Sequence, residues 1–459
     1  MMMKAKLTLL IVALFAGVTV LNAQASQECV TKMSIFSEHA KVKNYDAAYE
    51  PFMQLRKDCP KVSYALFQYG ERVLKHKIEN APAAEKKAFV DDLAKMYEEK
   101  KANYPSKTKT GDDLAELGLV MYENKIGTTQ EQYDQFKKAW EADAETFTNA
   151  KALYVYFVEA VQLQESGNID LQEVFDLYDA LTGKVTDEQN NYAKRLDPIL
   201  EKEENGTKLT SDEAKLKKIA SANLENYSKI VAGMNKALGD LADCDRLVPF
   251  YEKSYEEKKE DVAWVKGAAG RLVAKDCKGS ELFVKLVEQL NTLEPSPETS
   301  YYLGQLAEQK GDKSKALEYY LESAERQTDP TKKARVLYSI GKSYQDKGSY
   351  SNARKFYLDA VKAQPSFGAV YLQIAKMYAD SANNCGTTVF EKRAVYWKAA
   401  ETAARAGQID PSLSSTANQT AASYRGYAPD KSMIFSENMA GKKVTFKCWI
   451  GGSVMVPNL

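Results

Sequence analysis

The chain has 459 residues, of which 44% are hydrophobic and 27% charged, and its 63 basic and 63 acidic residues balance. A chain of this length is too long to fold around one compact hydrophobic core, so we expect several domains or an extended repeat array. The composition argues against wholesale disorder. The balanced charge gives no overall electrostatic signal for binding nucleic acid or an anionic membrane, although local patches stay open, and the chain has only two histidines as candidate bases or metal ligands.

Residues 1–25 have the pattern of a signal peptide. Lys4 and Lys6 precede an uncharged apolar run over residues 7–21, and residues 23–25 supply the small-x-small pattern of a cleavage site. An uncleaved membrane anchor is the alternative, but a run of about 15 residues is short for a hydrocarbon core of roughly 30 Å. The sequence therefore predicts an exported bacterial protein without an integral membrane span in the mature chain.

The six cysteines fall into three sequential pairs. Residues 29–59 and 244–277 each have the pattern of helix, turn and helix, with a cysteine at each outer end, and such ends lie side by side in an antiparallel hairpin. An oxidising compartment would preserve these bonds. We expect disulfides Cys29–Cys59, Cys244–Cys277 and Cys385–Cys448; buried free thiols are the alternative.

A helical period runs through almost the whole chain before residue 430, where strand signals are scarce. Degenerate helical pairs are predicted over residues 61–105, 112–147 and 148–183. Residues 184–240 are more polar and break this pattern. We predict a helical spacer over 186–240, between an N-terminal array over 26–185 and a C-terminal array over 241–411.

The clearest helical pair covers residues 334–365, with Gly348 ending its first helix. Small and large side chains alternate at Leu337, Ile340, Gly341 and Tyr344 in the first helix and at Ala353, Tyr357 and Ala360 in the second. Gly341 and Ala353 are small because the two helices cross there, and aromatic rings fill the space on either side. This pattern resembles the tetratricopeptide repeat, whose unit has about 34 residues.

Other segments share the pattern. One unit covers 297–330 with its turn at Gly311, and another begins at Tyr371 and carries an insertion over 383–390 that contains Cys385. The N-terminal hairpin resembles the second half of the repeat at Tyr45, Ala48, Phe52, Leu55 and Pro60. The resemblance implies an all-α fold, a solenoid of tetratricopeptide-like helical hairpins.

The resemblance also implies a binding surface, because the first helices of stacked repeats line a concave groove. The groove positions expected to be exposed are Tyr301, Gln305, Glu308, Arg335, Tyr338, Lys342, Leu372 and Lys376. Tyrosine and arginine often anchor protein interfaces, so a protein partner is predicted; ordinary surface residues are the alternative. Tyr301 and Gln305 stand where some family members have the Lys and Asn that hold a partner's C-terminal carboxylate.

From Lys442 onward the hydrophobic side chains recur at every second residue, as in a β-strand. Val444, Phe446, Cys448 and Ile450 alternate with polar or larger residues. A two-residue Gly451-Gly452 turn is predicted to lead into a second strand over 453–456. An isolated β-hairpin is only marginally stable in water, so this one should pack on the helices. We interpret the hairpin as a cap that covers the final helix pair. The alternative is a binding edge that adds a strand to a partner.

No catalytic motif of adequate specificity is present, and no metal or cofactor is predicted. His39 and His76 are interpreted as packed or solvated side chains. A glycosidase whose catalytic residues are all carboxylates stays an alternative.

The sequence thus predicts a non-catalytic scaffold or adaptor, periplasmic or outer-membrane-associated, that binds protein partners in the cell envelope. The alternatives are a periplasmic chaperone or assembly factor for exported proteins and, less favoured, a hydrolase of envelope polymers. The predicted domains are a signal peptide (1–25), the N-terminal array (26–185), the spacer (186–240), the C-terminal array (241–411) and a tail with a hairpin (412–459).

Overall fold

Helices dominate the computed structural model, which describes residues 27–458. The chain divides into two compact units, one ending at Tyr178 and the other beginning at Asp179. The predicted signal peptide, residues 1–25, lies outside the described residues. Across the described part, no helix combines the length and the apolar character needed to cross a membrane.

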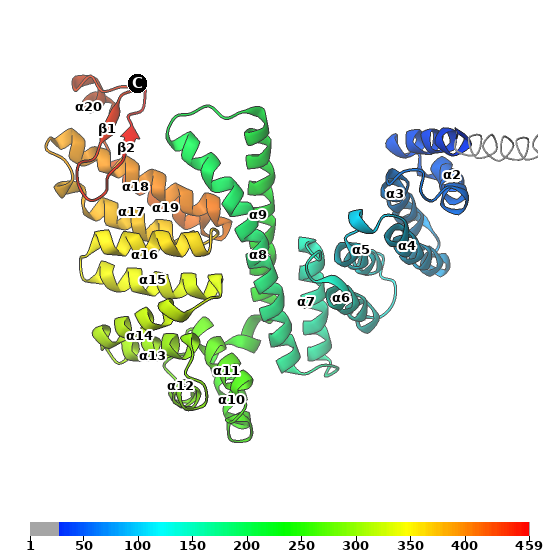
Figure 1. Cartoon of the computed structure of the whole chain (residues 1–459), viewed down its shortest axis with the longest axis horizontal. Helices are drawn as coiled ribbons and strands as arrows, with labels where there is room; N and C mark the ends of the chain where they lie inside the picture. Colours follow the sequence, from blue (N-terminus) through cyan, green and yellow to red (C-terminus); the bar gives the residue numbers. More distant parts are fainter. Residues whose placement is uncertain (1–26, 459) are drawn as a thin grey trace, which may run out of the picture. The chain divides into compact units, whose positions relative to one another are not determined.

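The N-terminal unit is a series of helical hairpins (Figure 1). Residues 27–41 are helical. The helices that follow are α2 (Tyr45–Asp58), α3 (Ala65–Asn80), α4 (Ala83–Asn103), α5 (Thr110–Glu123), α6 (Thr129–Asp143) and α7 (Ala150–Glu165). Aromatic side chains fill the first hairpin, where the rings of Phe36 and Phe52 stack with their centroids 5.6 Å apart. Both rings are fully buried, so they hold the two helices together.

The C-terminal unit continues the helical series. The long helix α8 (Leu171–Glu204) begins before the boundary between the units and continues into this one. The helices that follow are α9 (Ser211–Leu238), α10 (Cys244–Lys258), α11 (Val262–Ala274), α12 (Glu281–Leu293), α13 (Pro297–Gln309), α14 (Lys313–Arg326), α15 (Pro330–Asp346), α16 (Tyr350–Ala363), α17 (Ala369–Asp380), α18 (Val389–Ile409), α19 (Ser414–Tyr427) and α20 (Lys431–Ser436).

Polar side chains fix where many of these helices begin. In each case the capping side chain accepts a hydrogen bond from the backbone N–H three residues further on, which satisfies a donor that the helix itself leaves unpaired. The capping residues are Asp243, Asp261, Ser280, Ser296, Asp312 and Asp329. The local sequence therefore sets the boundaries of the hairpins between α10 and α15.

Two hairpins of the C-terminal unit close around a glycine. A Cβ on Gly341 would lie 2.6 Å from the ring of Tyr357, and one on Gly304 would lie 2.4 Å from the ring of Tyr320. The Tyr357 hydroxyl donates to Gln345 Oε1 at 2.6 Å, back on the first helix of its hairpin. Glycine therefore lets a buried tyrosine of the second helix lie directly across the first, as the alternation of small and large residues predicts.

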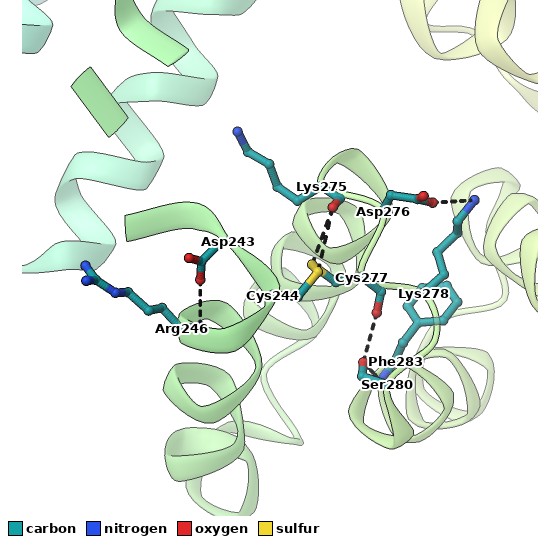
Figure 2. The surroundings of a disulfide bond; sticks show 9 residues. All are labelled: Asp243, Cys244, Arg246, Lys275, Asp276, Cys277, Lys278, Ser280 and Phe283. Atoms are coloured by element: carbon teal, nitrogen blue, oxygen red, sulfur yellow. Dashed lines mark hydrogen bonds and ion pairs between the residues drawn. A yellow bond between two sulfur atoms is a disulfide. The ribbon is translucent and has the colours of Figure 1, made fainter. Parts of the chain in front are cut away.

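The structure contains the three predicted disulfides. The Cα–Cα distances are 5.9 Å for Cys29–Cys59, 5.4 Å for Cys244–Cys277 and 5.3 Å for Cys385–Cys448. Cys244 is the first residue of α10 and Cys277 lies just beyond the end of α11, so this bond joins the outer ends of a hairpin (Figure 2). The described residues contain no free cysteine.

The C-terminal strands are shorter than predicted. β1 (Lys443–Thr445) pairs antiparallel with β2 (Ser453–Met455), and Val444 lies opposite Val454. The prediction of a two-residue Gly451-Gly452 turn is wrong, because the connection covers residues 446–452. The reason is that Cys448 bonds to Cys385 and its neighbours pack on helices, so this segment does not pair with β2.

The connection between the strands packs on α16 and α17. The Trp449 ring lies 5.5 Å from the rings of both Tyr350 and Tyr378, and its Nε1 donates to Ser381 Oγ at 3.1 Å. Arg354 lies over the Trp449 ring and donates to the carbonyl oxygen of Ile450. The tail therefore belongs to the C-terminal core, and the predicted all-α fold with a small C-terminal β-hairpin is confirmed.

The long helix α8 contacts widely separated helices of the C-terminal unit (Figure 1). Near the start of the unit, Arg271 of α11 donates to the carboxylate of Asp179. Further along, the side-chain oxygen of Asn190 accepts hydrogen bonds from the backbone N–H of Ser366 at 3.1 Å and from its hydroxyl at 2.7 Å. One helix thus links the first and the later hairpins of this unit.

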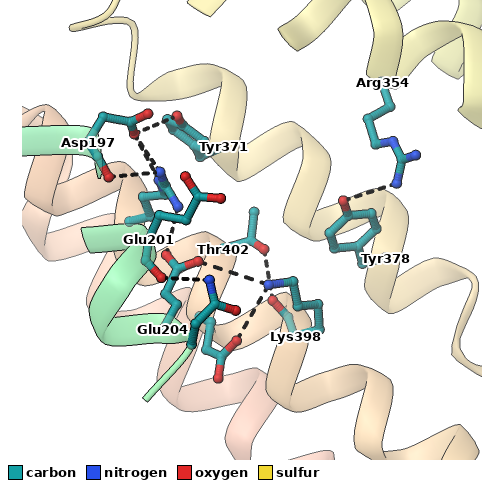
Figure 3. A network of polar contacts seen from close by, with 11 residues as sticks. Asp197, Glu201, Glu204, Arg354, Tyr371, Tyr378, Lys398 and Thr402 are labelled. Carbon is teal, nitrogen blue, oxygen red and sulfur yellow. Dashed lines mark hydrogen bonds and ion pairs between the residues drawn. The ribbon is translucent and has the colours of Figure 1, made fainter. Parts of the chain in front are cut away.

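The last turns of α8 bind α17 and α18 through a polar network (Figure 3). Arg405 of α18 pairs with Asp197 at 2.6 Å and with Glu204 at 3.0 Å, and the Tyr371 hydroxyl donates to Asp197 at 3.1 Å. The surrounding apolar cluster consists of Ala193, Leu196, Leu200, Ala220, Leu224, Tyr371, Ala406, Ile409 and Ala417. Residues predicted as a spacer therefore pack on the end of the array.

Gly341→Ala should lower the free energy of unfolding by about 1–3 kcal/mol, because the new methyl group meets the ring of the buried Tyr357. Gly267→Ala is the matched control, since no atom lies within 4 Å of the added Cβ in mid-α11. The control should be stabilising by about 0.5–1 kcal/mol. Urea denaturation measures both, and equal effects of the two substitutions would contradict the crossing geometry.

Arg405→Met should lower the stability of the C-terminal unit by about 2 kcal/mol, because Asp197 and Glu204 lose their shared cation while staying partly buried. Arg335→Met, at an exposed site without an ion pair in residues 27–458, should change stability by less than about 0.5 kcal/mol. Thermal and urea denaturation give the comparison. A stability loss no larger than that of the control would show that the network does not hold α8.

Candidate partner-binding groove

A pocket of about 260 Å³ lies on the first helices of the two hairpins that close around glycine. The lining residues are Lys278, Tyr301, Gln305, Glu308, Arg335, Tyr338, Ser339, Lys342 and Phe367. Helices α13 and α15 supply most of these side chains, and the segments after α11 and α16 supply Lys278 and Phe367. We use "the groove" for this set of nine residues.

Six of the eight residues proposed from the sequence line the groove, and Leu372 and Lys376 on α17 do not. Lys376 is exposed and pairs with Asp380 at 2.9 Å, within its own helix. Lys278, Ser339 and Phe367 line the groove but were not predicted. Lys278 and Phe367 lie outside the helices whose periodicity guided the prediction, so no signal in the repeat pattern marked them.

The expectation that Gln305 is exposed is wrong, since its exposed fraction is 6%. Its amide Nε2 donates to the Tyr320 hydroxyl at 2.6 Å, and its Oε1 accepts from Lys278 Nζ at 3.1 Å. The Tyr320 hydroxyl in turn donates to Glu308 Oε2 at 2.8 Å. Gln305 is therefore the centre of a hydrogen-bond network that fixes the floor of the groove.

Positive charge exceeds negative charge in the groove. Its cations are Lys278, Arg335 and Lys342, whereas Glu308 is its one carboxylate. Lys342 lies 3.9 Å from Glu308, a loose ion pair. Arg335 is exposed and forms no ion pair with any residue in 27–458, so its guanidinium is free to bind a carboxylate of another molecule.

Aromatic rings form the apolar part of the groove. The ring of Tyr338 lies 5.2 Å from that of Phe367 and 5.5 Å from that of Tyr357, and the ring of Tyr301 lies 5.8 Å from that of Tyr320. Burial raises the pKa of Tyr301 and of Tyr338, so both hydroxyls stay protonated at neutral pH. The groove thus combines rigid rings, neutral hydroxyls and cations, a set suited to a peptide with acidic and apolar side chains.

The described residues contain no group of three or more His, Cys, Asp or Glu side chains placed to hold a metal ion.

Comparison with known proteins places repeats on this groove. The model of the tetratricopeptide repeat family matches residues 298–330 and 334–367, which correspond to the hairpins α13–α14 and α15–α16. No curated protein matches the sequence significantly.

Several solved structures are similar at low identity. A tetratricopeptide repeat protein from Parabacteroides merdae is 14% identical with a TM-score of 0.24, over 70% of this chain and 99% of that one. Yeast Tom70 is 12% identical with a TM-score of 0.29, over 90% of this chain and 99% of that one. The TPR2AB domain of yeast Sti1, solved as a complex with pHSP90, is 14% identical with a TM-score of 0.23, over 69% and 96%.

The family match, the paired helices and the glycine–tyrosine crossings agree with one another. Proteins built from such repeats generally bind other proteins, and their fold is generally not catalytic. Residues 298–330 and 334–367 are tetratricopeptide repeats, and these two repeats supply most of the groove.

Proposed function

We propose that the chain is an exported, non-catalytic scaffold or adaptor that binds a protein partner of the cell envelope in the groove. The observation that carries the proposal is the composition of the groove, which has three cations, packed aromatic rings and only one carboxylate. Rigid aromatic rings and arginine are the residue types that most often anchor protein interfaces. The matching partner is an extended segment with acidic and apolar side chains.

The proposed location rests on two features. Residues 1–25 have the pattern of a signal peptide, and all six cysteines pair in disulfides, which persist in oxidising compartments. A periplasmic or outer-membrane-associated location agrees with both. The domain boundaries predicted at 185, 240 and 411 stay part of this proposal.

A periplasmic chaperone or assembly factor is the second candidate. It would bind many unfolded chains weakly, whereas a scaffold binds one or two folded partners in defined stoichiometry. Suppression of the aggregation of a denatured client protein therefore separates the two functions, and screens on envelope polymers address the less favoured hydrolase.

Reversing charge in the groove should weaken peptide recognition. Random dodecapeptides displayed on phage should yield acidic, aromatic-rich binders of the wild-type protein, and Arg335→Glu with Lys342→Glu should weaken these binders at least about tenfold. The matched control is Lys347→Glu with Lys355→Glu, which changes the same charge at exposed sites outside the groove. Equal binding by the two double variants, both folded by circular dichroism, would remove the groove from the proposal.

The export proposal predicts the state of the thiols. Protein purified from the native envelope fraction and alkylated without reductant should gain no mass, and after reduction it should gain six alkyl groups, one for each cysteine. Sequencing of its N-terminus should begin at Ser26, just after the proposed cleavage site. Six alkylated thiols in the untreated protein would contradict export to an oxidising compartment.

A further inference from the structure

A second pocket, of about 540 Å³, lies in the N-terminal unit and is lined by α4, α5 and α6. The lining side chains of α5 include Leu114, Leu117 and Met121, which are buried or half-buried and form its floor. The charged side chains that α4 and α6 contribute are exposed and form its two rims. We call this site, with its floor on α5 and its rims on α4 and α6, the cleft.

The cleft runs along the helices that line it. One row of its lining residues on α4 has spacings of three and four residues and consists of Lys87, Asp91, Ala94, Glu98 and Lys101. The lining residues of α5 and α6 have the same spacing, which keeps each row on one face of its helix. The row on α4 covers about four turns, or roughly 21 Å, and the cleft extends over that length.

Several apolar side chains inside the cleft are still partly exposed. Ala94, Leu114, Met121 and Ile126 line it and are only half-buried. Such side chains at spacings of three and four residues form a surface onto which a further helix packs, since its own apolar row fits between theirs. An extended segment fits less well, because its side chains alternate at every second residue and the helices around the cleft offer no strand edge.

The two rims begin at the same end of the cleft. Hydrogen bonds from Thr128 lower the pKa of Glu131 most, and the nearby charge of Lys87 lowers it further. Lys87 near the start of α4 therefore lies close to Glu131 in the first turn of α6. Asp91 also lines this end, so negative charge exceeds positive charge there.

The other end of the cleft has an excess of positive charge. Lys101 and Lys138 lie there with one exposed carboxylate, that of Glu98, while the buried Asp113 is already paired with Lys100. Lys138 and the charged rim residues of α4 form no ion pair within residues 27–458, so their charges stay available to a partner. A partner with both signs of charge, one at each end, matches this arrangement.

We propose that the cleft binds an amphipathic helix of a partner protein, about four turns long, with its apolar row against α5. The basic side chains of that helix lie beside Asp91 and Glu131, and its acidic side chains lie beside Lys101 and Lys138. This site goes beyond the proposed function, because the cleft belongs to the N-terminal unit and the groove to the C-terminal unit.

Phage-displayed helical peptides of about 16 residues test the proposal. Their apolar positions are spaced three and four residues apart and vary among Leu, Ile, Met and Phe, and the other positions vary among Lys, Glu and Gln. The full mature protein should select peptides that become helical on binding, which circular dichroism measures. Moving the apolar residues of a selected peptide to every second position, with its composition unchanged, should weaken binding at least about tenfold.

Two pairs of variants locate the site. Ala94→Phe places a ring in the cleft and should weaken the selected peptides at least about tenfold, whereas Ala88→Phe adds the same ring at an exposed position of α4 outside the cleft and should not. Lys101→Glu with Lys138→Glu leaves the apolar floor intact and should weaken acidic-ended peptides at least about fivefold. Its matched control makes the same charge changes at exposed sites outside the cleft, in Lys57→Glu with Lys95→Glu.

Thermal denaturation should show the variants to be folded, and the exposed lysine pair decides the outcome if the added ring disturbs folding. A library without a binder, or equal binding by a peptide with alternating apolar residues, would overturn the proposal. So would binding that the lysine pair in the cleft does not weaken more than its control. The groove variant Arg335→Glu with Lys342→Glu should bind the selected peptides as the wild type does, so the two sites are tested separately.

Discussion

Arg405 of α18 shares its guanidinium between Asp197 and Glu204 of α8, and Arg271 of α11 binds Asp179 of the same helix. Repeat arrays are otherwise held by contacts between neighbouring repeats, which leave their curvature free to vary. In this unit one long helix contacts α11, the segment before α17, and α18, so the hairpins between them have a fixed span. The desolvation of the two buried guanidinium groups is offset only while the helix stays in place, because its carboxylates are their ion-pair partners.

The groove lies on hairpins within that span. Its floor is rigid because Gln305 is hydrogen-bonded on both sides and the tyrosines of the second helices lie against glycine. A rigid floor lowers the conformational entropy that the groove loses on binding, since few of its side chains have to be ordered. The exposed cations at the rim, Arg335 and Lys342, stay available for contacts that select the partner.

The sequence was most informative where structure is local. The alternation around Gly341 and Tyr357 predicts a helix crossing that involves residues close in the chain, and cysteines at the ends of two hairpins predict Cys29–Cys59 and Cys244–Cys277 for the same reason. The contacts of α8 join residues about two hundred positions apart, such as Asp197 and Arg405. The hydrophobic periodicity of the sequence does not predict such contacts. The burial of Gln305 also escaped prediction, because the resemblance to the repeat family placed it among the exposed groove positions. The Gly451-Gly452 turn failed since the disulfide of Cys448 and the packing of Trp449 outweigh a local hairpin signal.

Native-state hydrogen exchange tests most directly whether α8 and the array form one cooperative structure. If the ion pairs and the apolar cluster hold α8 in place, its backbone amides from Asp179 to Leu200 should be protected as strongly as those of α15 and α16, because opening requires the whole unit to unfold. Exchange of α8 within seconds, while α15 and α16 stay protected for hours, would show a loosely attached helix and would contradict a groove of fixed shape.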